Sequence, residues 1–89
     1  MYKFERSEKL KRILKKLIRK DKVRYEATLK KIDEVLNSED PNHYKNLKHN
    51  MKEFKRVHID SHFVLIFKVD ENQKAIKFED LQHHDYIYK

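Results

Sequence analysis

Four of the six histidines stand in two short stretches of the chain. His58 and His62 belong to VHIDSHFVLIFKV, just before and at the start of its most apolar part, and His83 and His84 open the stretch HHDYIYK. Because histidine titrates near neutral pH, these side chains could donate and accept protons in a reaction. The simpler alternative is that each histidine is an ordinary surface or turn residue.

Basic residues precede His58 and His62 in the sequence. Lysine and arginine bind phosphate through charge-assisted hydrogen bonds, so this part of the chain could hold a phosphate group close to a proton-transferring histidine. The candidate phosphate-binding residues, all shortly before His58, are Lys45, Lys48, Lys52, Lys55 and Arg56.

The net charge of +7 is unevenly placed. Residues 1–36 contain 13 Lys or Arg against 6 acids, whereas residues 37–89 contain 9 of each. An excess of this kind favours a polyanionic partner such as nucleic acid, and Lys11, Lys15 and Lys16 are its expected contacts. The alternative is a helix face that is simply solvated.

The sequence contains no cysteine, which excludes disulfides, thiolate metal sites and cysteine nucleophiles. A metal site built on histidine is also not expected. His58 and His62 would share a face of a helix, but their segment has the pattern of a strand hairpin, and there is no HExxH motif. We therefore expect no metal and no other cofactor.

Length and hydropathy favour one small domain over residues 1–89. No apolar run approaches the roughly 20 residues of a membrane span. The charged start of the chain, with Lys3, Glu5 and Arg6, is unlike a secretory signal. These features favour a soluble cytoplasmic protein.

The first part of the chain predicts an edge strand at Tyr2–Glu5 and then two antiparallel helices. Ser7 and Asp21 are the expected helix N-caps. The apolar stripe of the first helix is Leu10, Ile13, Leu14, Leu17 and Ile18. For the second helix the expected buried face is Tyr25, Leu29, Ile32 and Leu36, with Ala27 and Val35 nearby.

From Phe54 onward the apolar period changes to two, which indicates strands. The first is Lys55–Ile59, with Arg56 and His58 on the face opposite Val57. His62–Val69 is apolar on both faces, as in a central strand, and Ala75–Leu81 follows the turn DENQ. The predicted fold is α+β, in the order β-α-α-β-β-β, with a small antiparallel sheet packed against the helical hairpin on one side.

Three segments in this order, NLKHNMKEFKRVHI, HFVLIFKV and HHDYIYK, resemble the RelE/ParE toxin superfamily, nearest to its RelE and YafQ branches. The resemblance implies the toxin of a type II toxin–antitoxin system. It implies an endoribonuclease that cuts messenger RNA in the ribosomal A site without metal and so inhibits translation. It also implies a RelB-like antitoxin partner in a toxin–antitoxin hetero-oligomer, with the ribosome and mRNA as further partners.

The same resemblance assigns roles to individual residues. His58 corresponds to a catalytic histidine of the YafQ-like pattern, and His84 and Tyr88 fall at family positions of the catalytic terminus. Lys55 stands where the RelE branch has a functional lysine, and His62 stands where the related branch has an aspartate.

Two further positions bear on the chemistry. Lys45 lies where the YafQ pattern has another functional histidine, and Val64 replaces the central-strand arginine of the RelE branch. The loss of that arginine shifts the expected chemistry toward histidine. The sequence is also compatible with two other functions. One is a non-catalytic, ParE-like poison of DNA gyrase, and the other is a basic RNA-binding module with incidental histidines.

Overall fold

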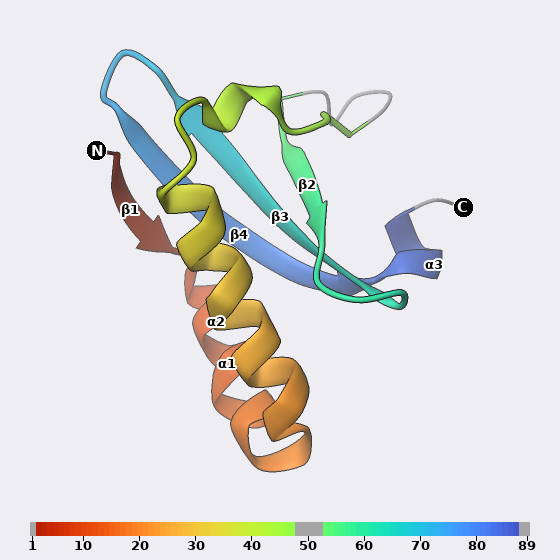
Figure 1. Cartoon of the computed structure of the whole chain (residues 1–89). Helices are drawn as coiled ribbons and strands as arrows, with labels where there is room; N and C mark the ends of the chain where they lie inside the picture. Colours follow the sequence, from red (N-terminus) through yellow and green to blue (C-terminus); the bar gives the residue numbers. More distant parts are fainter. Residues whose placement is uncertain (1, 48–52, 88–89) are drawn as a thin grey trace.

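The computed structural model describes residues 2–47 and 53–87. Its elements follow the predicted order (Figure 1). They are β1 (Lys3–Arg6), α1 (Glu8–Lys20), α2 (Lys22–Leu36), the 3-10 turn η1 (Pro41–His43), β2 (Lys55–His58), β3 (Phe63–Asp70), β4 (Ala75–His83) and α3 (His84–Ile87).

The four strands form one sheet in the order β1-β4-β3-β2. The three later strands are antiparallel neighbours, as predicted, but β1 pairs with β4 in parallel, from Lys3 beside Ala75 to Arg6 beside Phe78. The predicted antiparallel sheet of the three later strands is therefore confirmed, and the parallel pairing of β1 makes the four-stranded sheet mixed. Tight hairpins force β2, β3 and β4 to alternate in direction, whereas the long helical connection after β1 imposes no such constraint.

Both predicted helix caps are confirmed. Ser7 Oγ accepts a hydrogen bond from the backbone N–H of Leu10 at 3.0 Å, and Asp21 Oδ1 accepts one from Arg24 N–H at 3.1 Å. Each cap satisfies a donor that the first helical turn leaves without an intrahelical partner. The two helices then run side by side in opposite directions (Figure 1).

The buried face of α2 agrees with the predicted one at Ile32, with Tyr25 and Leu36 partly buried against the core, but it differs at Leu29 and Thr28. Thr28, Ile32 and Val35 are buried, whereas Leu29 is 36% exposed. Thr28 can enter the core because its hydroxyl donates to the Arg24 carbonyl oxygen at 2.8 Å, so its polar atom keeps a partner. The prediction was therefore wrong at Leu29, and it missed Thr28 because that residue is polar.

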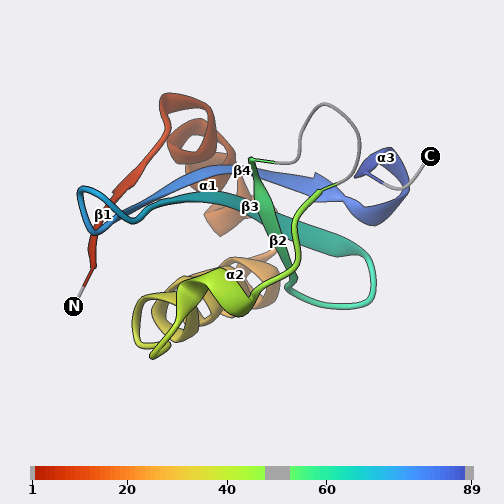
Figure 2. The same cartoon turned by 90° about the horizontal axis from the view of Figure 1, so that it is seen from above.

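Apolar side chains cover both faces of β3, as expected for a central strand. Leu65 and Phe67 pack in the main core with residues of both helices, while Val64 and Ile66 pack on the opposite face with Leu47. In Figure 2, α3 and the end of β4 that leads into it lie at the opposite end of the sheet from β1. No helix in the described ranges is long and apolar enough to cross a membrane.

Candidate active site

His58 and His84 lie together at one end of the sheet. His58 ends β2 and pairs with Val64 of β3, so its side chain lies on the face of Val64. His84 follows the last residue of β4. The two imidazole rings lie with their centroids 5.4 Å apart and their planes inclined at 36°. Two histidines from distant parts of the sequence thus form one site, which we call the histidine pair.

A backbone contact holds His84 beside this end of the sheet. The last registered pair of β3 and β4 is Phe63 with His83, and the next N–H, that of His84, donates to the His62 carbonyl oxygen at 2.6 Å. The chain then turns into α3. His62 therefore supports His84 through its backbone.

The adjacent histidines His83 and His84 have different surroundings. The ring of His83 packs edge-on against Phe63, with centroids 5.3 Å apart, and lies 6.0 Å from the ring of His62. The His62 ring also contacts the Ser61 hydroxyl at Nδ1, at 2.9 Å. His84, not His83, contacts His58, since neighbouring residues at the end of a strand lead to opposite faces.

Asp85 lies beside both His83 and His84 and was not among the candidates predicted from the sequence. Its carboxylate oxygens lie 3.7 Å from His83 Nδ1 and 3.8 Å from His84 Nδ1. The signal was present in the sequence as an acid directly after the two histidines. Within residues 2–47 and 53–87, no three His, Asp or Glu side chains are grouped as a metal ion requires.

Arg56 supplies positive charge on the same face as His58. It precedes His58 by two residues in β2, so both side chains leave the same side of the strand. Its guanidinium donates to the Asn46 carbonyl oxygen at 2.5 Å, and its backbone N–H donates to the Lys45 carbonyl oxygen at 2.9 Å. Lys45 is exposed beside this strand edge.

Lys55 occupies different surroundings from those expected of a catalytic lysine. It is only 9% exposed and lies on the face of β2 opposite His58, paired with core residue Phe67. Its ammonium group donates to the carbonyl oxygens of Asn42 and Tyr44, both at 3.2 Å, and to Asn46 Oδ1 at 2.7 Å. These contacts tie segment 42–46 to the sheet, so the structure does not bring Lys55 to the histidine pair.

The other candidate residues fall into two groups. Lys11, Lys15 and Lys16 are exposed on α1, which both views place apart from α3 (Figures 1 and 2). Lys48, Lys52 and Tyr88 lie outside the described residues.

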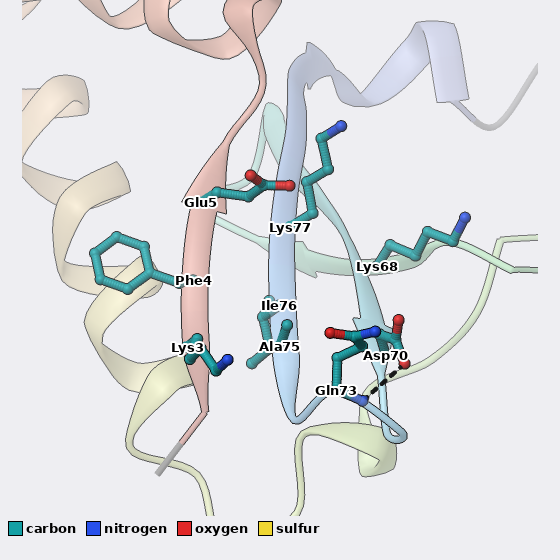
Figure 3. A pocket seen from close by; sticks show the side chains of 9 residues that line it. All are labelled: Lys3, Phe4, Glu5, Lys68, Asp70, Gln73, Ala75, Ile76 and Lys77. Carbon is teal, nitrogen blue, oxygen red and sulfur yellow. Dashed lines mark hydrogen bonds between the residues drawn. The ribbon is translucent and has the colours of Figure 1, made fainter.

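A hollow of about 450 Å³ lies among β1, β3, β4 and the turn between the last two strands (Figure 3). Its lining mixes three lysines with two acids: Lys3, Lys68, Lys77, Glu5 and Asp70. It contains none of the predicted site residues. The opposed charges give it no clear preference for an anion or a cation.

Known proteins similar to this chain identify the family. The chain is 52% identical over 89 residues to the Methanocaldococcus jannaschii protein named "Putative toxin RelE4", covering 100% of this chain and 93% of that protein. It is also 52% identical over 73 residues to an uncharacterised protein of Methanosarcina mazei, covering 82% of this chain and 83% of the relative. No protein-family model matches the sequence.

Solved structures show the same fold at low identity. The crystal structure of YafQ from E. coli strain BL21(DE3) matches with a TM-score of 0.69 at 20% identity and covers 100% of both chains. The solution structure of the conserved hypothetical protein HP0894 from Helicobacter pylori matches with a TM-score of 0.61 at 20% identity, covering 96% and 97% of the two chains. With the full-length sequence match, these likenesses confirm the resemblance inferred from the sequence: the chain belongs to the RelE toxin family.

Proposed function

We propose that this protein is the toxin of a type II toxin–antitoxin system and a ribosome-dependent, metal-independent endoribonuclease. It would cleave messenger RNA in the ribosomal A site and inhibit translation. The observation that carries the proposal is the histidine pair, with ring centroids 5.4 Å apart, on the same face as Arg56. Family membership is the second support.

Cleavage of RNA at a 2′-hydroxyl needs a base, an acid and positive charge. The base takes the 2′-OH proton as this oxygen attacks the phosphorus, and the acid protonates the leaving 5′-oxygen. Two adjacent imidazoles suit this division, because histidine can both donate and accept a proton near neutral pH. We assign the acid to His84, whose Nδ1 lies 3.8 Å from the Asp85 carboxylate, and the base to His58. Arg56 would stabilise the charge that develops on the phosphate.

The remaining candidates take supporting roles in this proposal. Lys45, Lys48 and Lys52 would contact the RNA backbone, and Tyr88 would stack on a base, a contact worth about 1–3 kcal/mol. Lys11, Lys15 and Lys16 would bind ribosomal RNA. His62 would act through its carbonyl oxygen, which accepts the His84 N–H. Lys55 has no catalytic role in this proposal, because the residue is buried and its ammonium group donates to three acceptors of segment 42–46.

In this proposal the protein is cytoplasmic, and its partner is a RelB-like antitoxin that is acidic or amphipathic. It would neutralise the basic surface and cover the histidine pair or displace the segment that carries His84. Hydrogen exchange of the complex tests this expectation. Protection of His58, His84 and their neighbours is the expected result, whereas protection confined to distant surfaces would contradict it.

The test of the function is to express the chain with and without its antitoxin and to map the ends of ribosome-bound messages. New 5′ ends within A-site codons, suppressed by the antitoxin, are the expected result. DNA damage without cleavage would favour a gyrase poison, and binding of RNA without either effect would favour a simple RNA-binding module.

A further inference from the structure

We propose that Arg24 and Asp60 are positioning residues that set the geometry of the histidine pair through the turn between β2 and β3. The inference rests on the proposed function for its catalytic consequence. The structural part concerns contacts within the chain and stands by itself. Neither residue carries a role in the chemistry described above.

Asp60 organises the turn that follows His58. Its Oδ1 atom accepts hydrogen bonds from the backbone N–H groups of His62 at 2.8 Å and Phe63 at 2.9 Å. The turn is closed by the Ile59 N–H, which donates to the Phe63 carbonyl oxygen at 2.9 Å. One carboxylate oxygen thus fixes the direction of two peptide groups, including the peptide before His62.

Arg24 holds the other oxygen of this carboxylate. Its Nε donates to Asp60 Oδ2 at 3.1 Å, and its guanidinium lies over the ring of Phe63, 4.1 Å from the centroid. A second contact, at 3.0 Å to Asp21 Oδ2, anchors the guanidinium to the start of α2. The Arg24 side chain is 25% exposed, so solvent screens the pair less than it would screen a surface ion pair.

The electrostatics of Asp60 agree with this arrangement. Burial raises the pKa of the Asp60 carboxyl group, but hydrogen bonds from His62, Arg24 and Phe63 outweigh burial and the net shift is downward. The folded chain therefore favours the ionised form of Asp60, which accepts all of these contacts.

The turn that Asp60 organises contacts the histidine pair through the backbone of His62. The His62 carbonyl oxygen accepts the His84 N–H at 2.6 Å, immediately beyond the last paired residues of β3 and β4. His58 enters the same turn from β2. Arg24 and Asp60 therefore connect α2 to both histidines, although their own side chains contact neither ring in the hydrogen bonds described.

The decisive comparison is Asp60→Ala with Asp60→Asn. The alanine variant loses the oxygen that accepts from both N–H groups, whereas asparagine keeps an oxygen for them. We expect Asp60→Ala to speed exchange of the His84 amide hydrogen by about tenfold, as loss of roughly one hydrogen bond predicts, and to weaken the nuclear Overhauser contacts between the rings of His58 and His84. Asp60→Asn should recover most of both signals.

Two variants of the partners complete the experiment. Arg24→Met keeps apolar packing on Phe63 but removes the contact to Asp60, so it should give an intermediate effect at His84. Asp21→Asn tests the second anchor: asparagine still caps α2 but loses the charged contact to the guanidinium, so its effect at His84 should be smaller than that of Arg24→Met. Arg24→Met also tests the inference if Asp60→Ala fails to fold.

The catalytic consequence is a separate measurement. Misplacement of a catalytic group by about 1 Å can lower the rate by about 100-fold. We therefore expect Asp60→Ala to lower kcat by up to about 100-fold and to leave KM nearly unchanged. Wild-type exchange and ring contacts at His84 in both Asp60→Ala and Arg24→Met would overturn the inference. A wild-type chain that cleaves no RNA would defeat the proposed function instead, since exchange and ring contacts are measured without RNA.

Discussion

The ammonium group of Lys55 donates a 2.7 Å hydrogen bond to Asn46 Oδ1, on the face of β2 opposite the candidate catalytic His58. Two further hydrogen bonds go to backbone carbonyl oxygens of segment 42–46. This lysine therefore connects the segment before the sheet to its edge strand. A buried cation with three acceptors has a structural role that its position in the sequence did not reveal.

We predict that Lys55→Met lowers the free energy of unfolding by about 1.5–3 kcal/mol, because three acceptors of segment 42–46 lose the charged donor that the buried lysine supplies. Chemical denaturation measures this change. Lys68→Met is the matched control: Lys68 is 47% exposed and pairs with Glu53 at 3.5 Å, so its loss should change stability by no more than about 0.5 kcal/mol. Equal stability of the Lys55→Met variant and the wild type would contradict the structural role.

We predict that His58→Ala and His84→Ala each slow cleavage of ribosome-bound mRNA by about 10²–10⁴-fold, the usual contribution of one proton-transfer group. Because the two act as a unit, the double variant should be little slower than the worse single variant. All variants should melt close to the wild type. His43→Ala is the control, since His43 lies in η1 and contacts Asp40. Undiminished cleavage by either single variant would remove that histidine from the mechanism.

We predict that reversing Lys11, Lys15 and Lys16 to glutamate weakens ribosome association and flattens its dependence on salt. Each lost phosphate contact should reduce the slope of log affinity against log salt by roughly one. Reversal of three α2 lysines, Lys22, Lys30 and Lys31, produces the same change in net charge. If both triple variants alter the slope equally, the effect comes from overall charge and the specific role of the α1 face is wrong.

We predict that Glu71 contributes stability that depends on pH. Hydrogen bonds from Lys74, Tyr2 and Asn42 lower its pKa from 4.5 to about 2. The folded state therefore favours the carboxylate, and this contribution is present above about pH 4.5 and is lost as the pH falls toward 2. Thermal unfolding of wild type and Glu71→Gln at a series of pH values should show a difference in Tm near neutrality that shrinks in acid.

A matched exposed acid separates this effect from the general acid sensitivity of the fold. Glu34 forms an exposed ion pair with Lys31 at 2.9 Å, within α2. Glu34→Gln should leave the shape of the Tm curve against pH close to that of the wild type. A Tm difference for Glu71→Gln that stays constant from neutrality to about pH 2 would show that the shift does not contribute.

Local features of the sequence determined the order of the elements and the helix starts. Ser7 and Asp21 each cap a helix through a contact only three residues along the chain, so nearby sequence is sufficient to predict them. The alternation after Phe54 predicted the strands, with boundaries shifted by one or two residues. It also placed Arg56 and His58 on one face, because strand periodicity is a local property.

Contacts between distant segments decided the rest. Tertiary packing sets three features that local sequence does not specify. They are the parallel pairing of β1 with β4, the burial of Thr28 on α2, and the burial of Lys55 on β2. The sequence marked four histidines as candidates, but only the register of β3 with β4 and the turn into α3 bring His84, and not His83, to His58. Periodicity specifies the face on which a side chain lies; the partner across that face is set by tertiary packing.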